Sequence, residues 1–198
     1  VQRERQAASC LKATAEYFEE WLKDSYADIG AEDVENWLVE DSVEDSDQSG
    51  LNDAIVELIE AGRGLPDHDT KLANFFEALR ALKSERADAK ILLFSTFKRT
   101  LKYLERLIRS ELQDVVDVVY HMDGDTPIQQ RGAIVEQFRT TEGFVVLLSS
   151  EVGGEGLDFQ FTDTLFNYDL PWNPMVVEQR IGRLDRFGQK SERINIYS

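Results

Sequence analysis

Apolar runs alternate with helical patterns from residue 70 to the end of the chain. Short runs rich in Val, Ile, Leu and Phe predict strands, and apolar positions three and four apart predict helices. The predicted strands are 91–94, 115–120, 144–148, 164–168 and 193–197. The predicted helices are 70–85, a helix ending near residue 112, 127–139 and 174–186. Continuous apolar strands separated by helices indicate an α/β fold, a parallel sheet with helices on both faces.

The first 69 residues have a different character. Helix-forming residues at 3–26 predict a helix, with apolar residues such as Leu11 and Phe18 at helical spacings. The charged, small and polar stretch 40–50 predicts a linker, and a short helix is expected at 51–62. We therefore predict two parts: an acidic, mainly helical accessory segment at 1–69 and a globular domain at 70–198.

The negative charge is concentrated in one part of the chain. The formal net charge is −16, and the window 24–69 holds 15 acidic residues against one base, Arg63, so the rest carries about −2. The overall charge therefore does not exclude nucleic-acid binding by the second part. The acidic window fits a solvated connector, a mask that competes with nucleic acid, or the acid-rich composition of a salt-adapted organism.

Composition excludes several classes of protein. A single cysteine, Cys10, allows no internal disulfide or cysteine-built metal site, and the only two histidines are far apart in the sequence; we predict no zinc or other metal site. No apolar run has the length of a membrane span, and no signal peptide is seen, so we expect a cytoplasmic protein without a membrane partner. The start at Val1 and the end within a strand-like run suggest a piece of a larger protein.

Polar and glycine-rich segments follow four of the predicted strands. In parallel sheets, ligands bind beyond the carboxyl ends of the strands, so these segments are expected to share one functional edge. They are 95–97, 121–127, 149–158 and 169–173.

Three arginines stand close together after the fourth of these segments. Arg180, Arg183 and Arg186 lie at i, i+3 and i+6 in Gln-Arg-Ile-Gly-Arg-Leu-Asp-Arg. One planar guanidinium group can donate two parallel hydrogen bonds to phosphate oxygens, so a cluster of arginines suits a polyphosphate ligand. The alternative is a helix held by surface ion pairs, with Glu178 and Asp185 as partners.

The ordered motifs resemble motifs IV to VI of superfamily-two helicases. The resemblance rests on 91–97, on Asp-Gly-Asp-Thr-Pro at 123–127 with the later Arg131, on Gly-Gly-Glu-Gly at 153–156, on Pro-Trp-Asn-Pro at 171–174, and on 179–189. Within that superfamily the chain is most similar to Swi/Snf-type translocases of the bacterial, RNA-polymerase-associated (RapA-like) branch. The resemblance covers about 70–198 and implies a RecA-like fold, the second of two such lobes.

The resemblance also implies roles for individual residues. Arg183 and Arg186 match arginine fingers that act on the phosphates of ATP. Further positions match the nucleotide-coupling turn and the ordering of the arginine motif: Gly154, Gly156, Asp158, Gln179 and Arg180. Others match positions beside the nucleic-acid backbone: Ser95, Thr96, Gly124, Ser149 and Ser150. Glu151 and Glu155 depart from the basic or neutral residues of many relatives, which would weaken contact with phosphate.

The phosphate loop and the acidic box of such enzymes are missing from this sequence. We therefore expect this chain alone to be inactive, with ATP and its Mg held mainly by an N-terminal RecA-like lobe of the same polypeptide. The implied partners are that lobe, duplex DNA, and RNA polymerase or another DNA-bound complex. Two alternatives stay open: the lobe of an RNA or single-strand helicase, and a non-catalytic interaction module whose acidic segment recruits a basic partner.

Other conspicuous residues have ordinary structural interpretations. Trp21, Trp37 and Trp172 are expected to pack in cores, although Trp172 follows a strand end and a contact role is open. His121 is expected to be a hydrogen-bonded structural residue, and Asp185 an orienting ion-pair partner.

Overall fold

The computed structural model describes residues 10–16, 60–61, 64, 69–154 and 156–198. The chain divides into two compact units, Val1–Asp69 and Thr70–Ser198. In the first unit residues 11–16 are helical, in agreement with that part of the predicted helix. The predicted linker at 40–50, most of the helix at 51–62, and the two tryptophans at 21 and 37 lie outside the described residues.

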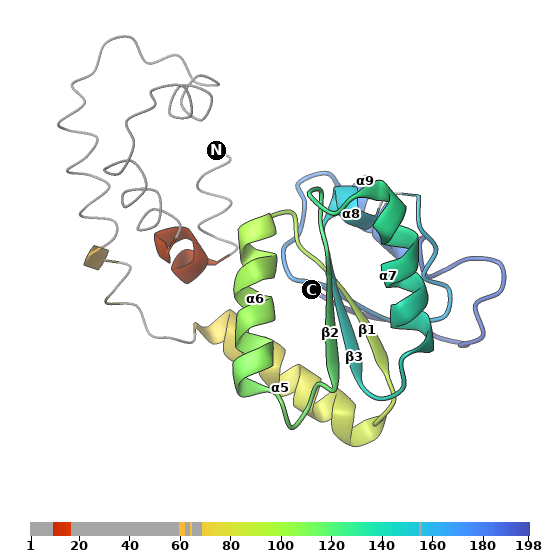
Figure 1. Ribbon diagram of the computed structural model, residues 1–198, viewed down its shortest axis with the longest axis horizontal. Coiled ribbons are helices and arrows are strands. Elements are labelled where there is room, and N and C mark those ends of the chain that lie inside the picture. Colours follow the sequence, from red (N-terminus) through yellow and green to blue (C-terminus); the bar gives the residue numbers. More distant parts are fainter. Residues whose placement is uncertain (1–9, 17–59, 62–63, 65–68, 155) are drawn as a thin grey trace, which may run out of the picture. The chain divides into compact units, whose positions relative to one another are not determined.

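The second unit is built on a parallel sheet of five strands (Figure 1). Its order is β2-β3-β1-β4-β5, and all four neighbouring pairs are parallel. The strands are β1 Lys90–Phe94, β2 Val118–Met122, β3 Val145–Ser149, β4 Thr164–Asn167 and β5 Asn195–Tyr197. The predicted α/β fold with a parallel sheet is therefore confirmed.

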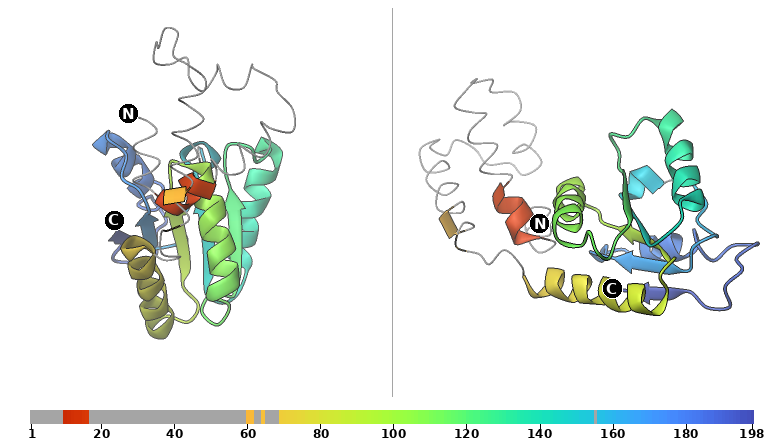
Figure 2. Two further views of the ribbon diagram at one scale, coloured as in Figure 1. Left: turned by 90° about the vertical axis from the view of Figure 1, so that its left-hand side faces the viewer. Right: turned by 60° about the horizontal axis from the view of Figure 1, so that its bottom comes forward.

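Helices cover both faces of this sheet. The chain moves from β1 across to β2 and then returns through β3, β4 and β5, so right-handed crossovers place the helix before β2 and the helix after it on opposite faces. Helices α5 Thr70–Glu85 and α6 Lys98–Glu111 lie on one side of the sheet, and α7 Ile128–Thr140 lies on the other (Figures 1 and 2). The short α8 Glu151–Gly154 and α9 Pro174–Ile181 lie near the end of the sheet where α7 begins.

The strand residues divide between two cores because successive side chains point to opposite faces. Toward α7, Leu92, Leu147 and Leu165 form a fully buried cluster with Phe138. Toward α5, the ring of Phe166 meets that of Phe75 edge-on at 5.4 Å. Full burial of one such side chain stabilises the fold by about 1.5–3 kcal/mol. The interior strands are covered on both sides, which explains their continuous apolar sequences.

The second strand starts later than the sequence pattern predicts. Val115 and Val116 are buried, but their amides bond to the Leu112 carbonyl at 3.0 and 2.8 Å and close the end of α6. The strand begins only after Asp117, whose carboxylate accepts from the Phe144 amide at 2.7 Å. The predicted strand at 115–120 is thus wrong by three residues at its start, because two of its apolar residues cap a helix.

The last predicted helix also ends earlier. Helix α9 ends at Ile181 rather than at residue 186. Beyond it the backbone tightens into turns, with the Arg183 amide bonded to the Arg180 carbonyl at 3.1 Å and Leu184 to Ile181 at 2.9 Å. Arg183 and Arg186 therefore lie on turns and not on a regular helix.

Candidate functional site at the carboxyl edge of the sheet

Asp169 joins the ends of two strands at the predicted functional edge. It follows β4, and its carboxylate accepts from the Ser95 hydroxyl at 2.5 Å and from the Thr96 amide at 2.9 Å, both just after β1. The Ser95 amide in turn bonds to the carbonyl of Ser149, the last residue of β3. The ends of β1, β3 and β4 are therefore fixed to one another.

The predicted nucleic-acid residues fall into two groups. Ser95, Ser149 and Ser150 are buried, and their hydroxyls bond inside the lobe, to Asp169, to the Ser150 carbonyl and to the Gly153 amide respectively. Thr96 is exposed and Gly124 is half-buried, so these two can present atoms to a ligand. The serines fit a role in shaping the edge better than direct contact with phosphate.

The three arginines of the cluster all reach the glycine-rich segment that follows β3. Arg180 pairs with the Glu151 carboxylate, Arg183 donates to the Gly154 carbonyl at 2.5 Å, and Arg186 pairs with Asp158. The two segments thus run side by side. The ion pairs of Arg180 and Arg186 are made with this segment and not with Glu178 and Asp185, so the surface-ion-pair alternative was wrong about the partners.

Arg180 is the most enclosed of the three arginines. Its side chain has no exposed surface, and its guanidinium also donates to Asn167 Oδ1 at 2.8 Å and to the Asp169 carbonyl at 3.0 Å. The guanidinium carbon lies 5.3 Å from the centre of the Phe94 ring. This position fits the ordering role that we predicted for Arg180 and leaves no surface for a ligand.

The contact with Arg180 explains why position 151 can carry a glutamate where many relatives carry a basic or neutral residue. Its carboxylate is bound by Nε of Arg180 at 2.9 Å and by a second guanidinium nitrogen. The negative charge at this position is therefore matched within the lobe, which reduces its expected repulsion of a phosphate. Glu155, the other departure, lies outside the described residues.

Arg183 and Arg186 are less enclosed. Arg183 is half-buried, and the Arg186 side chain is 48% exposed while it is paired with Asp158, which is 54% exposed. Gln179 is exposed. The accessible guanidinium groups of this cluster are therefore those of the two predicted arginine fingers.

The glycines of the turn serve two different purposes. Gly156 has a positive φ of 74°, a conformation that favours glycine. Gly153 and Gly154 are needed for close packing instead: a Cβ at 153 would lie 2.5 Å from the Met122 carbonyl oxygen, and one at 154 would lie 3.0 Å from the Phe94 ring. The turn is therefore pressed against the strand ends.

Replacing Gly153 by alanine tests this packing. The new methyl group would collide with backbone atoms of Met122 and Asp123, which cannot rotate away. We expect the free energy of unfolding to fall by about 1–3 kcal/mol, the usual cost of overpacking. Urea denaturation of Gly153→Ala should show this fall, while Gly132→Ala, whose Cβ would meet nothing within 4 Å, should show none. Equal stability of the two variants would contradict the packing.

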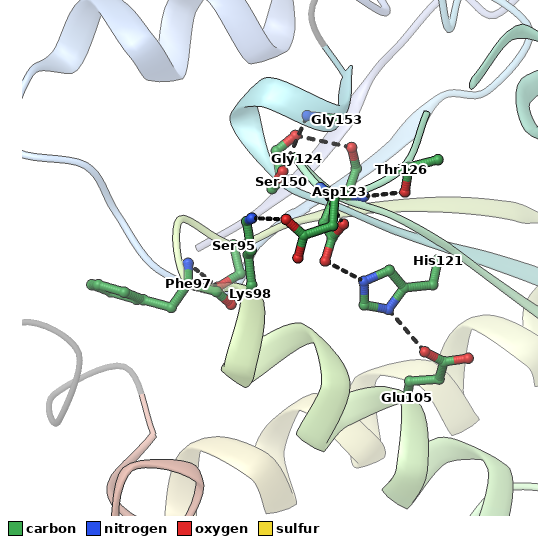
Figure 3. Close-up of polar contacts among 12 residues, drawn as sticks. Ser95, Phe97, Lys98, Glu105, His121, Asp123, Gly124, Thr126, Ser150 and Gly153 are labelled. Atoms are coloured by element: carbon green, nitrogen blue, oxygen red, sulfur yellow. Dashed lines mark hydrogen bonds and ion pairs between the residues drawn. The ribbon is translucent and has the colours of Figure 1, made fainter. Parts of the chain in front are cut away.

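A compact turn at 123–126 follows β2 at the same edge. The Asp123 amide donates to the Thr126 hydroxyl at 3.0 Å, and Asp123 Oδ1 accepts from the Asp125 amide at 2.9 Å. Arg131 of α7 donates to the Thr126 carbonyl at 2.9 Å. His121 contacts Asp123 from the strand, so its predicted role as a hydrogen-bonded residue is confirmed (Figure 3).

Trp172 lies on the surface, and its predicted place in the core is wrong. Its side chain is 78% exposed, beside the exposed Leu170 and Met175. The cause is local: the Asn173 side chain accepts from the Met175 amide at 3.0 Å and caps α9, and Pro174 occupies the first turn. The segment is thus a helix start, which turns Trp172 away from the core.

Sequence reasoning missed Asn167 as a member of this edge, and it placed Asp169 there without predicting its contacts. Both bind Arg180, and Asp169 also holds the β1 end. The available signal was a polar residue at the last position of an apolar strand, Asn167, with Asp169 just beyond it. No pattern in the sequence indicated that both would face a buried arginine.

Comparison with known proteins identifies the family to which this lobe belongs. The family model described as the helicase conserved C-terminal domain matches residues 71–188, more than half of the chain. The chain belongs to this helicase family. The matched region contains the glycine-rich segment and the whole arginine cluster.

Relatives within the family support the predicted branch. The RNA polymerase-associated protein RapA of Vibrio cholerae is 38% identical over 129 residues, 65% of this chain and 13% of its own length. The uncharacterized ATP-dependent helicase YqhH of Bacillus subtilis is 34% identical, over 58% of this chain and 19% of its own. The probable ATP-dependent DNA helicase CHR23 of Arabidopsis thaliana is 39% identical, over 59% and 11%. This helicase-family lobe therefore spans a small part of each relative.

Solved structures give the same fold. The C-terminal part of the Fun30 ATPase domain matches with a TM-score of 0.58 at 22% identity, over 75% of this chain and 47% of that one. The Sulfolobus solfataricus SWI2/SNF2 ATPase core in complex with dsDNA matches with a TM-score of 0.53 at 17% identity, over 96% and 37%. The predicted RecA-like fold and the resemblance to RapA-like, Swi/Snf-type C-terminal lobes are confirmed. No helix in the described part of this lobe is long and apolar enough to cross a membrane.

Proposed function

We propose that this helicase-family lobe is the C-terminal motor lobe of an ATP-dependent, DNA-stimulated translocase of the Swi/Snf type. One observation carries the proposal: Arg180, Arg183 and Arg186 all bind the segment 151–158, which joins the glycine-rich turn and the arginine motif into one unit. That unit stands at the carboxyl edge of a parallel sheet, where such folds bind ligands.

Within this unit the arginines have distinct roles. Arg180 orders the turn from inside, whereas Arg183 and Arg186 keep accessible guanidinium groups that suit phosphate oxygens. ATP supplies the free energy of the translocation step, and its phosphates would be held together with Mg by a separate N-terminal RecA-like lobe. Asp158 pairs with Arg186, so the coupling turn and the finger are linked directly.

The partners follow from the same proposal. Thr96 and Gly124 at the carboxyl edge would lie along duplex DNA, and backbone contacts of this kind carry no sequence information. The Sulfolobus neighbour was solved with dsDNA, and the V. cholerae relative is named for its association with RNA polymerase. We extend both to this protein, with duplex DNA as the track and RNA polymerase as a candidate partner. We place its action in the cytoplasm.

Nucleic-acid stimulation of ATP hydrolysis by the full-length protein tests this function. We expect duplex DNA to raise the rate well above the rates with single-stranded DNA or RNA, because a duplex translocase closes its lobes on a duplex. Equal stimulation by RNA or single strands would favour the helicase alternative. A rate that no nucleic acid changes would favour the non-catalytic interaction module.

A further inference from the structure

His121 stands between two carboxylates outside the arginine site. Its Nδ1 lies 2.8 Å from Glu105 Oε2 on α6, and its Nε2 lies 3.2 Å from Asp123 Oδ2 in the turn after β2 (Figure 3). The His121 side chain is 17% exposed and that of Asp123 is 6% exposed. The imidazole therefore bridges a helix and the 123–126 turn in a largely enclosed position.

The geometry of this bridge favours the protonated form of His121. A neutral imidazole carries one N–H, so one of its nitrogens would direct a lone pair at a carboxylate. Only the imidazolium can donate to both Glu105 and Asp123. Burial alone lowers the pKa of His121, but the hydrogen bonds to these two carboxylates outweigh burial and raise the pKa above the ordinary value.

Asp123 transmits the position of His121 to the turn. One of its carboxylate oxygens accepts from His121 and the other from the Asp125 amide at 2.9 Å, while its own amide and carbonyl bond to Thr126. Gly124, predicted to lie beside the nucleic-acid backbone, is inside this turn. The orientation of Asp123 therefore sets the orientation of the Gly124 backbone.

The charged groups around His121 come from α6 and from the turn. Arg109 of α6 donates to Glu105 and, at 2.8 Å, to the Val119 carbonyl. Lys98 of α6 pairs with Asp125 at 2.5 Å. On β3 the residue paired with His121 is the buried Leu148, which carries no charge. The two cations oppose a positive charge at His121, whereas the carboxylates of Glu105 and Asp123, which contact the ring directly, favour it and raise its pKa despite burial.

We propose that the His121 imidazolium is a positioning residue that holds the 123–126 turn in the conformation that meets the DNA backbone. Loss of its proton leaves the imidazole with a single N–H. The shorter contact, with Glu105 at 2.8 Å, keeps that N–H, so Asp123 Oδ2 faces a lone pair and the turn loosens. DNA binding by this lobe is then strong below the ordinary pKa of histidine, about 6.5, and weakens as the pH rises through the raised pKa of the folded protein. This inference rests on the proposed function, because it requires DNA at this edge.

The test compares His121→Gln with the wild-type full-length protein between about pH 6 and pH 9. The wild-type affinity for a fluorescent DNA duplex should fall about ten-fold across this range, the size of one charge-assisted hydrogen bond. His121→Gln should bind weakly throughout, with a flatter profile. Glu105→Gln, which keeps the imidazole but removes one anion, should move the midpoint of the fall to lower pH. The control is Tyr120→Phe, which removes a 2.8 Å hydrogen bond to Thr141 from the neighbouring residue of the strand and should leave the profile unchanged.

Amide hydrogen exchange gives a readout that needs no DNA. Exchange at Asp125 and Thr126 should be faster in His121→Gln than in the wild type at pH near 6, and equal in the two at high pH. If wild type and His121→Gln have the same exchange rates and the same DNA affinity at every pH, the positioning role is overturned while the proposed function stands. If exchange differs as expected but the wild-type protein binds no duplex DNA, the proposed function fails, and with it the link between the turn and DNA.

Discussion

Replacing Arg183 by alanine in the full-length protein is expected to lower DNA-stimulated ATP hydrolysis by about 10³-fold or more. Removal of an arginine that stabilises charge on a transferred phosphoryl group typically costs about 10³–10⁵ in rate. In the described part of the lobe, Arg183 donates to the Gly154 carbonyl, a neutral partner, so its positive charge is not cancelled by an ion pair there. We therefore expect the rate constant of hydrolysis to fall much more than the affinity for ATP.

The Arg186→Ala variant should lower the rate as well, with a second effect. Arg186 is paired with Asp158, so its loss also releases the coupling turn. Asp158→Asn should therefore reproduce part of the Arg186→Ala defect but not the Arg183→Ala defect. Steady-state hydrolysis rates with saturating duplex DNA measure all three changes.

Arg139→Ala provides the matched control for these variants. Arg139 pairs with Glu136 near the end of α7, where both side chains are more than half exposed. Helix α7 runs from the carboxyl edge toward the opposite edge, so Arg139 lies away from the site. Its variant should hydrolyse ATP at the wild-type rate. Survival of DNA-stimulated hydrolysis in both Arg183→Ala and Arg186→Ala would show that the finger assignment is wrong.

The sequence predicted the sheet well because the relevant pattern is local. Side chains alternate between the two faces of a strand, so the continuous apolar run 144–148 predicts a strand that is buried on both faces. Strand β3 is indeed buried along its whole length. The pattern failed where apolar residues had another use. Val115 and Val116 close the end of a helix, and no periodicity over six residues distinguishes that from the start of a strand.

The site was predictable only in part, because its contacts join distant segments. The arginine cluster and the glycine turn could each be found, but their pairing, with Arg180 on Glu151 across 29 positions, could not. Glu151 consequently looked like an obstacle to phosphate binding, whereas it is the partner of a buried arginine. Trp172 shows the opposite error, since a large aromatic was assigned to the core although a helix cap fixes it at the surface.

Arg180 is the residue whose loss should destabilise this lobe most. Its guanidinium is fully buried and bonds to Glu151, Asn167 and Asp169, which come from α8, the end of β4 and the loop before α9. Removing one partner of a buried ion pair leaves the other without compensation and costs about 3–5 kcal/mol. The Glu151 side chain is 33% exposed and water can solvate part of its charge, so we expect Arg180→Ala to lower the free energy of unfolding by an amount at the lower end of this range.

A pair of further variants separates the charge from the shape of Arg180. Arg180→Lys keeps the charge but lacks the planar fork, so it cannot bond to Glu151, Asn167 and Asp169 together and should recover only part of the stability. Arg180→Met with Glu151→Met removes both charges and fills the space with apolar groups, and should be more stable than Arg180→Ala. Urea midpoints rank the three proteins. If Arg180→Ala unfolded at the wild-type midpoint, Arg180 would not be holding the edge together, and the ordered turn that presents Arg183 and Arg186 would need another explanation.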